Sequence, residues 1–260
     1  MSLLSAVIVS YRSGELLQAC LESLLRNGSA VDDQIFVINN GPAGELASLK
    51  IAGLLNFRVV QSPSNLGFGR AANVGYRSSQ SEYVLLLNPD IRLESNSIEA
   101  LLQTLYSDPE AGIVLPQLRH PDGTLQYSCR SFYSCRTLLM RRGPWKKWFS
   151  NHHLVREHLM LDWDHQSLRA VDWGLGAAML IRRSAAGPIL FDERFFLYFE
   201  DVDLCLRICE NGWKVLYNPN ARMVHHHQRE SANSFSLKAK GHHFLSMAKF
   251  LWKYRSKLKK

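Results

Sequence analysis

Short runs of β-branched and aliphatic residues alternate with amphipathic stretches through the first half of the chain. The apolar runs end at polar or turn-forming residues and predict buried strands at residues 5–11, 34–38, 57–61 and 83–87. Between them, apolar residues recur every three or four positions, which predicts helices at residues 15–25, 67–78 and 96–106. Because strands alternate with helices, we expect an α/β fold with a doubly wound, mostly parallel sheet flanked by helices.

The hydrophobic pattern changes after about residue 115. Residues 118–127 carry a Pro-Asp-Gly turn between short runs and predict a hairpin, whereas residues 129–168 are irregular, basic and aromatic. The remaining chain predicts a strand-like run interrupted by glycines, a helix, a short strand and a final helix, at residues 171–181, 200–211, 214–217 and 236–257. No repeat or flexible linker divides the chain, so we expect one domain whose second half extends the sheet.

Positive charge is concentrated in two segments of this chain. The formal net charge of the 260 residues is +8. Basic residues occur without any acid between residues 129 and 150, and again after Glu230. Such segments favour a polyanionic partner. The charge lies at the periphery and follows no nucleic-acid-reading motif, so we expect no nucleic acid among the partners.

The cysteines and the first residues bear on the compartment. The five cysteines lack metal-ligand spacing, so we expect reduced structural thiols in a cytosolic protein. The chain begins Met-Ser-Leu-Leu, without a basic region or a long apolar run, and so predicts no signal peptide. No window approaches the ~18 apolar residues that a membrane span needs. The expected location is the cytoplasm, for a soluble or peripheral protein.

A carboxylate follows the fourth predicted strand. The apolar run at residues 83–87 leads directly into Asn88-Pro89-Asp90. A buried strand of an open α/β sheet that ends in an acid places it where a ligand binds. Mg²⁺ or Mn²⁺ needs only one or two protein carboxylates when phosphates and waters complete its coordination, and the ion stabilises a departing diphosphate. Taken alone, Asp90 is equally well explained as a turn residue.

A second acidic motif, Glu200-Asp201, follows five residues of which four are aromatic. So apolar a run tends to be buried, and carboxylates beside it need a partner or a purpose. Asp201 falls at the start of a predicted helix, where the helix dipole favours the ionised form. An ionised acid facing a cleft accepts the proton of an attacking hydroxyl. The alternative is an ordinary helix cap with acids in the first turn, which Asp203 supports.

Seven motifs in this order and spacing resemble the family-2, inverting glycosyltransferases with a GT-A fold, and among these the bacterial rhamnosyltransferase-like enzymes. They extend over nearly the whole chain and are Val7-Ile8-Val9-Ser10-Tyr11, Val37-Ile38-Asn39-Asn40-Gly41, residues 65–73, Asn88-Pro89-Asp90, residues 176–180, residues 200–204 and Val224-His225-His226-His227. The resemblance implies a single GT-A domain of residues 1–235. A nucleotide-binding half would cover residues 1–115 and an acceptor half residues 116–235, followed by a basic amphipathic helix at residues 236–260.

On the donor side the resemblance implies that Asp90 holds the metal and the diphosphate. Asn88 replaces the first acid of the family's Asp-x-Asp motif, which implies a metal site with a single carboxylate. Asn39 stands where many relatives carry an Asp that binds the pyrimidine. The other implied nucleotide-binding residues are Ser10, Tyr11, Asn65, Gly67, Arg70 and Asn73.

On the acceptor side the resemblance implies that Asp201 is the general base, with Glu200 orienting the acceptor or supporting Asp201. His225 matches a position that supplies a further metal ligand or contacts the diphosphate, and a satisfied histidine is the equally open alternative. The run of three histidines predicts no zinc site, because neighbours in an extended chain point to opposite faces. The implied acceptor-binding residues are Trp173, Gly174 and Gly176, with core packing as the alternative for Trp173.

The implied reaction is transfer of a sugar, with inversion, from a nucleotide donor to a hydroxyl of a glycan or polyprenyl-diphosphate-linked acceptor. A dTDP-sugar such as dTDP-rhamnose is the expected donor, with UDP-sugars second, and Mg²⁺ or Mn²⁺ the expected cofactor. Residues 244–252 place apolar residues at helical spacing among lysines, a pattern typical of helices at membrane surfaces. This helix predicts either contact with the inner face of the cytoplasmic membrane or packing on the core.

Other function classes fit the sequence less well. A sugar-phosphate nucleotidyltransferase needs a glycine-rich basic loop after the first strand, whereas residues 10–14 hold one glycine and one arginine. A nicotinamide dehydrogenase is disfavoured because no G-x-G-x-x-G follows Tyr11. A basic nucleic-acid-binding module and an inactive family member that only binds a partner remain as alternatives, although both key acids are present.

Overall fold

The computed structural model describes residues 3–27, 34–47, 49, 57–143, 147–226 and 237–256. His227 and the last four residues, which belong to segments named above, lie outside these ranges. No helix in the described part of the chain is long and apolar enough to cross a membrane. All five cysteines are free thiols, as expected.

The strands and helices expected in the first half are confirmed. They are β1 (Leu4–Ser10), α1 (Gly14–Arg26), β2 (Gln34–Asn39), β3 (Phe57–Gln61), α2 (Phe68–Ser78), β4 (Tyr83–Leu87) and α3 (Ser97–Ser107). Two further strands, β5 (Ile91–Leu93) and β6 (Ala111–Arg119), were not predicted. β5 is too short to show a period, and β6 contains Pro116, which argues against a central strand. Pro116 is tolerated because it lies beyond Val114, where the pairing of β6 with β10 ends.

The second half contains more regular structure than its sequence pattern indicates. Its elements are β7 (Cys129–Arg130), α4 (Cys135–Arg142), α5 (His153–His158), β8 (Arg169–Val171), β9 (Trp173–Gly174), β10 (Ala178–Arg182), α6 (Arg183–Ala186), α7 (Glu200–Glu210), β11 (Lys214–His225) and α9 (Leu237–Lys253). The expectation of an irregular segment at residues 129–168 was therefore wrong. A capping box between Ser134 and Thr137 begins α4 there, in a segment without apolar periodicity.

Two expected strands differ in extent. The run at residues 171–181 forms three separate strands, because β8 pairs with β11, β9 with β7, and β10 with β4 and β6. The strand expected at residues 214–217 continues to His225 through an irregularity between Asn218 and Arg222. The hairpin expected at residues 118–127 is reduced to a turn with one bridge, between Arg119 and Leu125.

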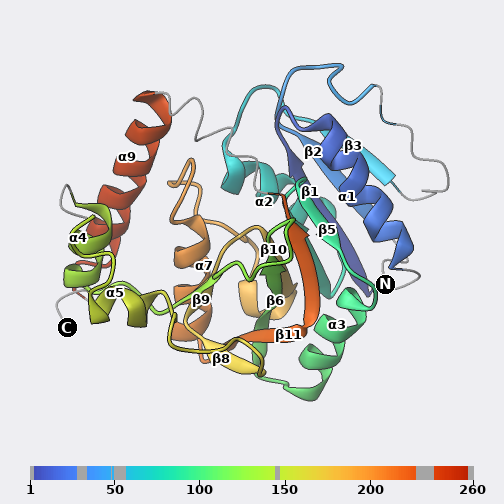
Figure 1. Cartoon of the computed structure of the whole chain (residues 1–260). Coiled ribbons are helices and arrows are strands. Elements are labelled where there is room, and N and C mark those ends of the chain that lie inside the picture. Colours follow the sequence, from blue (N-terminus) through green and yellow to red (C-terminus); the bar gives the residue numbers. More distant parts are fainter. Residues whose placement is uncertain are drawn as a thin grey trace.

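The central sheet has nine strands in the order β3-β2-β1-β4-β10-β6-β11-β5, with β8 beside β11 (Figure 1). β3, β2, β1, β4, β6 and β11 run in one direction, and β10, β5 and β8 run in the other, so the sheet is mostly parallel. β10 enters antiparallel between β4 and β6. The carboxyl ends of β1, β2, β3 and β4 consequently meet at one edge, where an open α/β sheet binds its ligands.

Helices cover both faces of this sheet. Alternate residues of β1 point to opposite sides, so that Val7 and Val9 belong to one core and Ala6 and Ile8 to the other. The first core contains side chains of α2, α7 and α9, and the second contains those of α1 and α3. All seven residues of β1 are buried, as its unbroken apolar run requires.

The C-terminal helix α9 packs against α7 and also presents apolar residues to solvent. Phe250 and Tyr254 are buried in the core, whereas Phe244 and Trp252 are 63% and 65% exposed. One side of α9 therefore packs on the core, and the other side exposes a row of apolar residues to solvent.

Candidate active site

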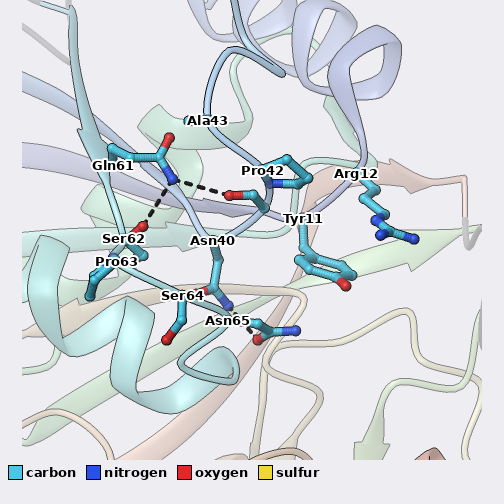
Figure 2. Close-up of a pocket in the computed structure, with 11 residues that line it drawn as sticks. Tyr11, Arg12, Asn40, Pro42, Ala43, Gln61, Ser62, Pro63, Ser64 and Asn65 are labelled. Carbon is cyan, nitrogen blue, oxygen red and sulfur yellow. Dashed lines mark hydrogen bonds between the residues drawn. The ribbon is translucent and has the colours of Figure 1, made fainter.

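An open pocket of about 460 Å³ lies at the carboxyl ends of β1, β2 and β3. Figure 2 shows Gln61 and Ser62 across this pocket from Tyr11 and Arg12. The remaining lining residues are Asn40, Gly41, Pro42, Ala43, Pro63, Ser64 and Asn65. Amide groups and one aromatic ring around an open hollow suit a flat base with hydrogen-bonding edges.

Ser10 and Asn39, predicted at the nucleotide edge, lie beneath the pocket and support its wall. Both side chains are buried. The Asn39 amide donates to Gln61 Oε1 at 2.7 Å and to the Pro42 carbonyl at 3.0 Å, and its oxygen accepts from the Gly41 N–H. Asn39 thus orients Gln61, which itself lines the pocket. Tyr11 and Asn65 are the predicted residues that line it directly.

The segment that begins with the predicted nucleotide-binding residues Asn65 and Gly67 contacts two other parts of the chain. Asn40 donates to Asn65 Oδ1 at 3.1 Å and accepts from the Leu66 N–H at 2.8 Å. Gly67 has a φ of +79°, and a Cβ there would lie 2.3 Å from the Phe196 carbonyl oxygen. Only glycine fits both the conformation and the space.

Arg70 and Asn73 point toward the loop after α6 and contact its residues. Arg70 is half-exposed and donates to the Glu193 carbonyl at 3.2 Å. Asn73 is fully buried, and its amide group bonds Phe191 through both main-chain atoms and the Glu193 carboxylate. Asn73 therefore positions the loop and does not reach the nucleotide pocket.

Asp90 faces His225 at the end of β4. Asp90 Oδ2 lies 3.3 Å from His225 Nε2, and the His226 N–H donates to the Asp90 carbonyl at 2.9 Å. His225 Nδ1 lies 2.9 Å from Gln126 Oε1, an acceptor, so Nδ1 donates to Gln126 and the ring directs Nε2 toward Asp90. The two side chains predicted as metal ligands therefore lie next to each other.

The donor set of Asp90 and His225 fits a divalent metal. Two adjacent ligands of an octahedral ion with bonds of about 2.1 Å lie roughly 3 Å apart, close to the observed separation of Oδ2 and Nε2. Carboxylate and imidazole suit Mn²⁺, and Mg²⁺ accepts a carboxylate together with substrate phosphates. Among the described residues, no group of three or more His, Cys, Asp and Glu side chains has metal-ligand geometry. In the described part of the chain two ligands are thus available, and substrate phosphates and water would fill the other positions of a bound ion.

Glu200 and Asp201 begin α7 after an unusual turn. Tyr198 and Phe199 both adopt a φ of +69°, a left-handed conformation that is rare for aromatic residues and typically found at functional sites. Asp201 Oδ2 accepts from the Gly176 N–H at 3.2 Å, and Oδ1 accepts from the Val202 N–H at 2.9 Å. Both oxygens are therefore held in place by the main chain.

The environments of the two adjacent acids differ. Glu200 is buried, and its Oε2 has no hydrogen-bond partner among the described residues. Burial, and after it the negative charge of Asp201, raises the pKa of Glu200 to about 8. Glu200 is thus the member that keeps its proton at neutral pH. A pair of acids separated in this way is how a site assigns distinct roles to two carboxylates.

A short chain of main-chain contacts joins the two acidic motifs. The Asn88 N–H donates to the Ala177 carbonyl at 2.8 Å, and the N–H of the preceding residue, Gly176, donates to Asp201. Asp90 follows Asn88 by two residues. The motifs that carry Asp90 and Asp201 therefore contact the same short main-chain segment, residues 176–177.

Of the three predicted acceptor residues, only Gly176 contacts Asp201. Trp173 is 4% exposed and donates through Nε1 to the Ser131 carbonyl at 3.0 Å. A Cβ on Gly174 would lie 2.3 Å from Leu115 Cδ1, so this glycine is required for packing. We assign Trp173 and Gly174 to the core.

Several residues of the site were missed by sequence reasoning. Asn40 and Gln61 line the pocket, and Gln126 orients His225. Asn40 stands next to a predicted residue in a recognised motif, whereas Gln126 is brought to His225 only by the tertiary fold. Nothing in the residues around Gln126 indicates that contact.

The fold is that of the GT-A glycosyltransferases. Mannosyltransferase PcManGT of Pyrobaculum calidifontis, in complex with GDP-Man and Mn²⁺, superposes with a TM-score of 0.63 at 14% identity, covering 96% of this chain and 64% of that one. GalNAc-T7 with UDP, GalNAc and Mn²⁺ gives a TM-score of 0.63 at 15% identity, covering 86% of this chain and 43% of that one.

The chain belongs to glycosyl transferase family 2, whose sequence profile matches residues 5–170. An N-acetylglucosaminyl-diphospho-decaprenol L-rhamnosyltransferase of Mycobacterium tuberculosis is 30% identical over 262 residues, covering 92% of this chain and 81% of the relative. Rhamnosyltransferase WbbL of Escherichia coli K12 is 28% identical over 198 residues, covering 73% and 71% of the two chains. The expected family is confirmed.

Proposed function

We propose that this protein is a metal-dependent, inverting rhamnosyltransferase of cell-surface polysaccharide synthesis. It transfers rhamnose from dTDP-rhamnose to a hydroxyl of a sugar linked to a lipid diphosphate. The observation that carries this proposal is that Asp90 lies 3.3 Å from His225, while the main chain of residues 176–177 bonds both Asn88, two residues before Asp90, and Asp201. The pocket lies at the ends of β1, β2 and β3 of the same sheet.

The reaction follows from the arrangement of the residues. Asp201 accepts the proton of the acceptor hydroxyl, and the oxygen attacks the anomeric carbon on the side opposite the departing nucleoside diphosphate. Asp90 and His225 would hold Mn²⁺ or Mg²⁺, which when bound stabilises the charge of the diphosphate. Glu200, with its proton retained, supports Asp201 without competing for the acceptor proton. Inversion requires no covalent intermediate and hence no nucleophilic side chain.

The donor nucleotide is assigned to the pocket lined by Tyr11, Asn40 and Gln61. Amide groups bind the paired oxygen and N–H of thymine or uracil, and the names of two relatives favour rhamnose as the sugar. dTDP-rhamnose is therefore the first candidate and UDP-sugars are the second. By the same proposal, residues 1–115 bind the donor, residues 116–235 bind the acceptor, and residues 236–260 are a separate helical extension.

The decisive experiment is a panel of donors. Purified protein is incubated with Mn²⁺ or Mg²⁺ and one of dTDP-rhamnose, UDP-glucose, UDP-N-acetylglucosamine or GDP-mannose, and release of nucleoside diphosphate is measured with and without EDTA. We expect release from dTDP-rhamnose alone, and its loss in EDTA. Release only from another donor would contradict the assigned sugar, and full activity in EDTA would contradict the metal.

The acceptor places the protein at a membrane. The name of the mycobacterial relative describes an acceptor with a diphospho-decaprenol group. On α9 the outward row of Phe244, Ala248 and Trp252 lies beside the exposed Lys249 and Arg255, a combination that favours an anionic lipid surface. We place the protein in the cytoplasm, bound peripherally at the inner face of the cytoplasmic membrane.

A further inference from the structure

The loop between α6 and α7, residues 187–199, is bonded by the helix that continues the predicted nucleotide-binding segment. At the start of α2 the Phe68 N–H donates to the Phe196 carbonyl at 3.1 Å. Further along α2 the buried Asn73 amide bonds both main-chain groups of Phe191, at 2.8 Å each. The loop is therefore held against α2 at two separate places.

The C-terminal helix α9 bonds the same loop through other carbonyl groups. Ser246 is 2% exposed, and its hydroxyl donates to the Leu197 carbonyl at 2.9 Å. Lys249 donates to the Arg194 carbonyl at 2.8 Å. The two donors are three residues apart and so lie on one face of α9. Because Leu197 lies three residues before Glu200, α9 bonds the part of the loop that leads into α7.

Aromatic rings of α9 pack on the last two residues of this loop. The ring of His243 lies 5.0 Å from the ring of Tyr198 and 5.6 Å from that of Phe199, measured between centroids. Phe250 lies 5.2 Å from Phe199, and both of these rings are buried. Together with the hydrogen bond to the preceding carbonyl, these rings bring α9 against all three residues that come directly before α7.

The residues that α9 contacts include the left-handed turn before the two acids. Tyr198 and Phe199, each with a φ of +69°, adopt a conformation that side chains of this size rarely take. Such a conformation persists only where the surrounding contacts hold it. Asp201 follows this turn by two residues, and its Oδ2 lies 3.2 Å from the Gly176 nitrogen. The contacts that hold the turn therefore also set the position of the Asp201 carboxylate.

We propose that α9 positions the general base of the transfer reaction, and that Ser246 is a positioning residue for Asp201. This inference rests on the proposed function. The Ser246 hydroxyl is buried and bonds a main-chain carbonyl, so it acts through the left-handed turn and not by touching substrate. The family profile matches residues 5–170 and covers neither the loop nor α9. The C-terminal helix is thus a working part of the active site as well as a surface for lipid.

The first test is the kinetics of Ser246→Ala, which removes one hydroxyl from α9. We expect kcat for rhamnose transfer to fall about tenfold to a hundredfold, the effect of a catalytic group displaced by about 1 Å. KM for dTDP-rhamnose should stay unchanged, because α2 holds the donor side of the loop. The matched control is Ser97→Ala on α3, which removes a buried hydroxyl that donates to the Glu94 and Arg222 carbonyls and should leave kcat unchanged. Equal kcat for the two variants would overturn the inference.

The second test needs no turnover. Hydrogen exchange is measured by mass spectrometry on peptides that cover the left-handed turn and the first turn of α7, in wild type, Ser246→Ala and Ser97→Ala. We expect faster exchange there in Ser246→Ala alone, because the turn has lost one of the contacts that hold it. Exchange equal to that of wild type would overturn the inference even if the donor panel succeeds. A donor panel without any release would instead reject the proposed function, whatever the exchange rates.

Discussion

At the scale of single residues, the proposed site contains two neighbouring acids in different surroundings. Glu200 and Asp201 are adjacent in the chain, yet one is enclosed without a hydrogen-bond partner and the other accepts two main-chain N–H groups. The left-handed turn at Tyr198 and Phe199 precedes this pair. Burial is thus the main difference between the two carboxyl groups, and it raises the pKa of Glu200.

Asp201→Asn tests the assignment of the general base. Asparagine keeps an oxygen to accept from Gly176 or Val202, so the start of α7 should be preserved. We expect transfer to fall by about 10²- to 10⁴-fold, the usual contribution of a positioned base. The dissociation constant of dTDP-rhamnose, measured by calorimetry, should change less than about threefold. Turnover equal to that of wild type would contradict the base assignment.

Glu200→Gln tests the raised pKa through stability. The folded protein keeps the Glu200 proton at a pH where the unfolded chain has lost it, so the folded state binds more protons and its stability falls as the pH rises from about 5 to about 8. Glutamine imitates the protonated acid and removes this loss. Urea unfolding should show that the variant gains stability relative to wild type with rising pH. Glu22→Gln, on the exposed side of α1, is the control and should show no such trend.

Gln126→Leu tests the role of Gln126 in orienting His225. Leucine cannot accept the proton of Nδ1, so the lone pair of Nε2 loses its fixed direction toward Asp90. We expect the Mn²⁺ concentration for half-maximal activity to rise about tenfold to a hundredfold. Saturating Mn²⁺ should restore most of the rate. A rate that stays low at saturating metal would instead indicate a role for Gln126 in folding or substrate binding.

At the scale of elements, α9 is fastened to the helix that carries the proposed base. Asp203, fully buried in the first turn of α7, accepts from Arg207 of its own helix and from Lys253 and Tyr254 at the end of α9. Lys253 also bonds Asp192 at 2.8 Å. The position of α7 therefore depends on the docking of α9.

Lys253→Met tests this connection. The change removes a charged donor from the buried Asp203 while keeping the aliphatic part of the side chain. We expect the free energy of unfolding to fall by about 1–3 kcal/mol, because a buried carboxylate loses a charged hydrogen bond. Lys249→Met, which loses only an exposed contact to the Arg194 carbonyl, should cost less than about 0.5 kcal/mol. Equal losses, measured by urea unfolding, would contradict a special role for Lys253.

The helices and strands also show how much of the fold can be predicted from sequence patterns. The predicted strands and helices of the first half are present because each buries an unbroken run or an amphipathic face within a repeating strand–helix order. α4 was missed because its residues lack apolar periodicity and its start depends on the side chains of Ser134 and Thr137. The three strands within residues 169–182 were merged because their separate pairing partners are distant in sequence.

The residues of the candidate site differ in the same way: some are indicated by sequence motifs, and others depend on the tertiary fold. Asp90, His225 and Asp201 were identified because they end a strand or begin a helix within recognisable motifs. Asn73 and Trp173 were expected to contact ligands, with core packing as the alternative for Trp173. Both are buried and hydrogen-bond main-chain atoms, because burial cannot be judged from their motifs alone.

At the scale of the whole molecule, the proposed donor pocket and the exposed apolar row of α9 lie on different sides of the protein. Figure 1 shows α9 and α4 on the left of the view, and β2 and β3, which border the donor pocket, at the upper right. A protein that rests on a membrane through α9 would keep its nucleotide pocket away from the lipid. The donor would then enter from the aqueous side.

Trp252→Glu tests membrane contact through α9. Replacing an exposed aromatic ring with a negative charge removes apolar contact and adds repulsion from anionic lipid. We expect the fraction that sediments with phosphatidylglycerol vesicles to fall several-fold, with binding of wild type weakened by salt. Leu25→Glu, which adds the same charge on α1, is the control. Equal sedimentation of wild type and Trp252→Glu would refute the contact.

The place of His225 at the end of β11 has a consequence for synthesis of the protein on the ribosome. Asp90 is translated before its imidazole partner, which is the final residue of β11. A nascent chain can thus assemble the nucleotide pocket while it still lacks half of the ion-binding pair. By the proposed function, the site that transfers the activated sugar is therefore complete only after His225 has been translated.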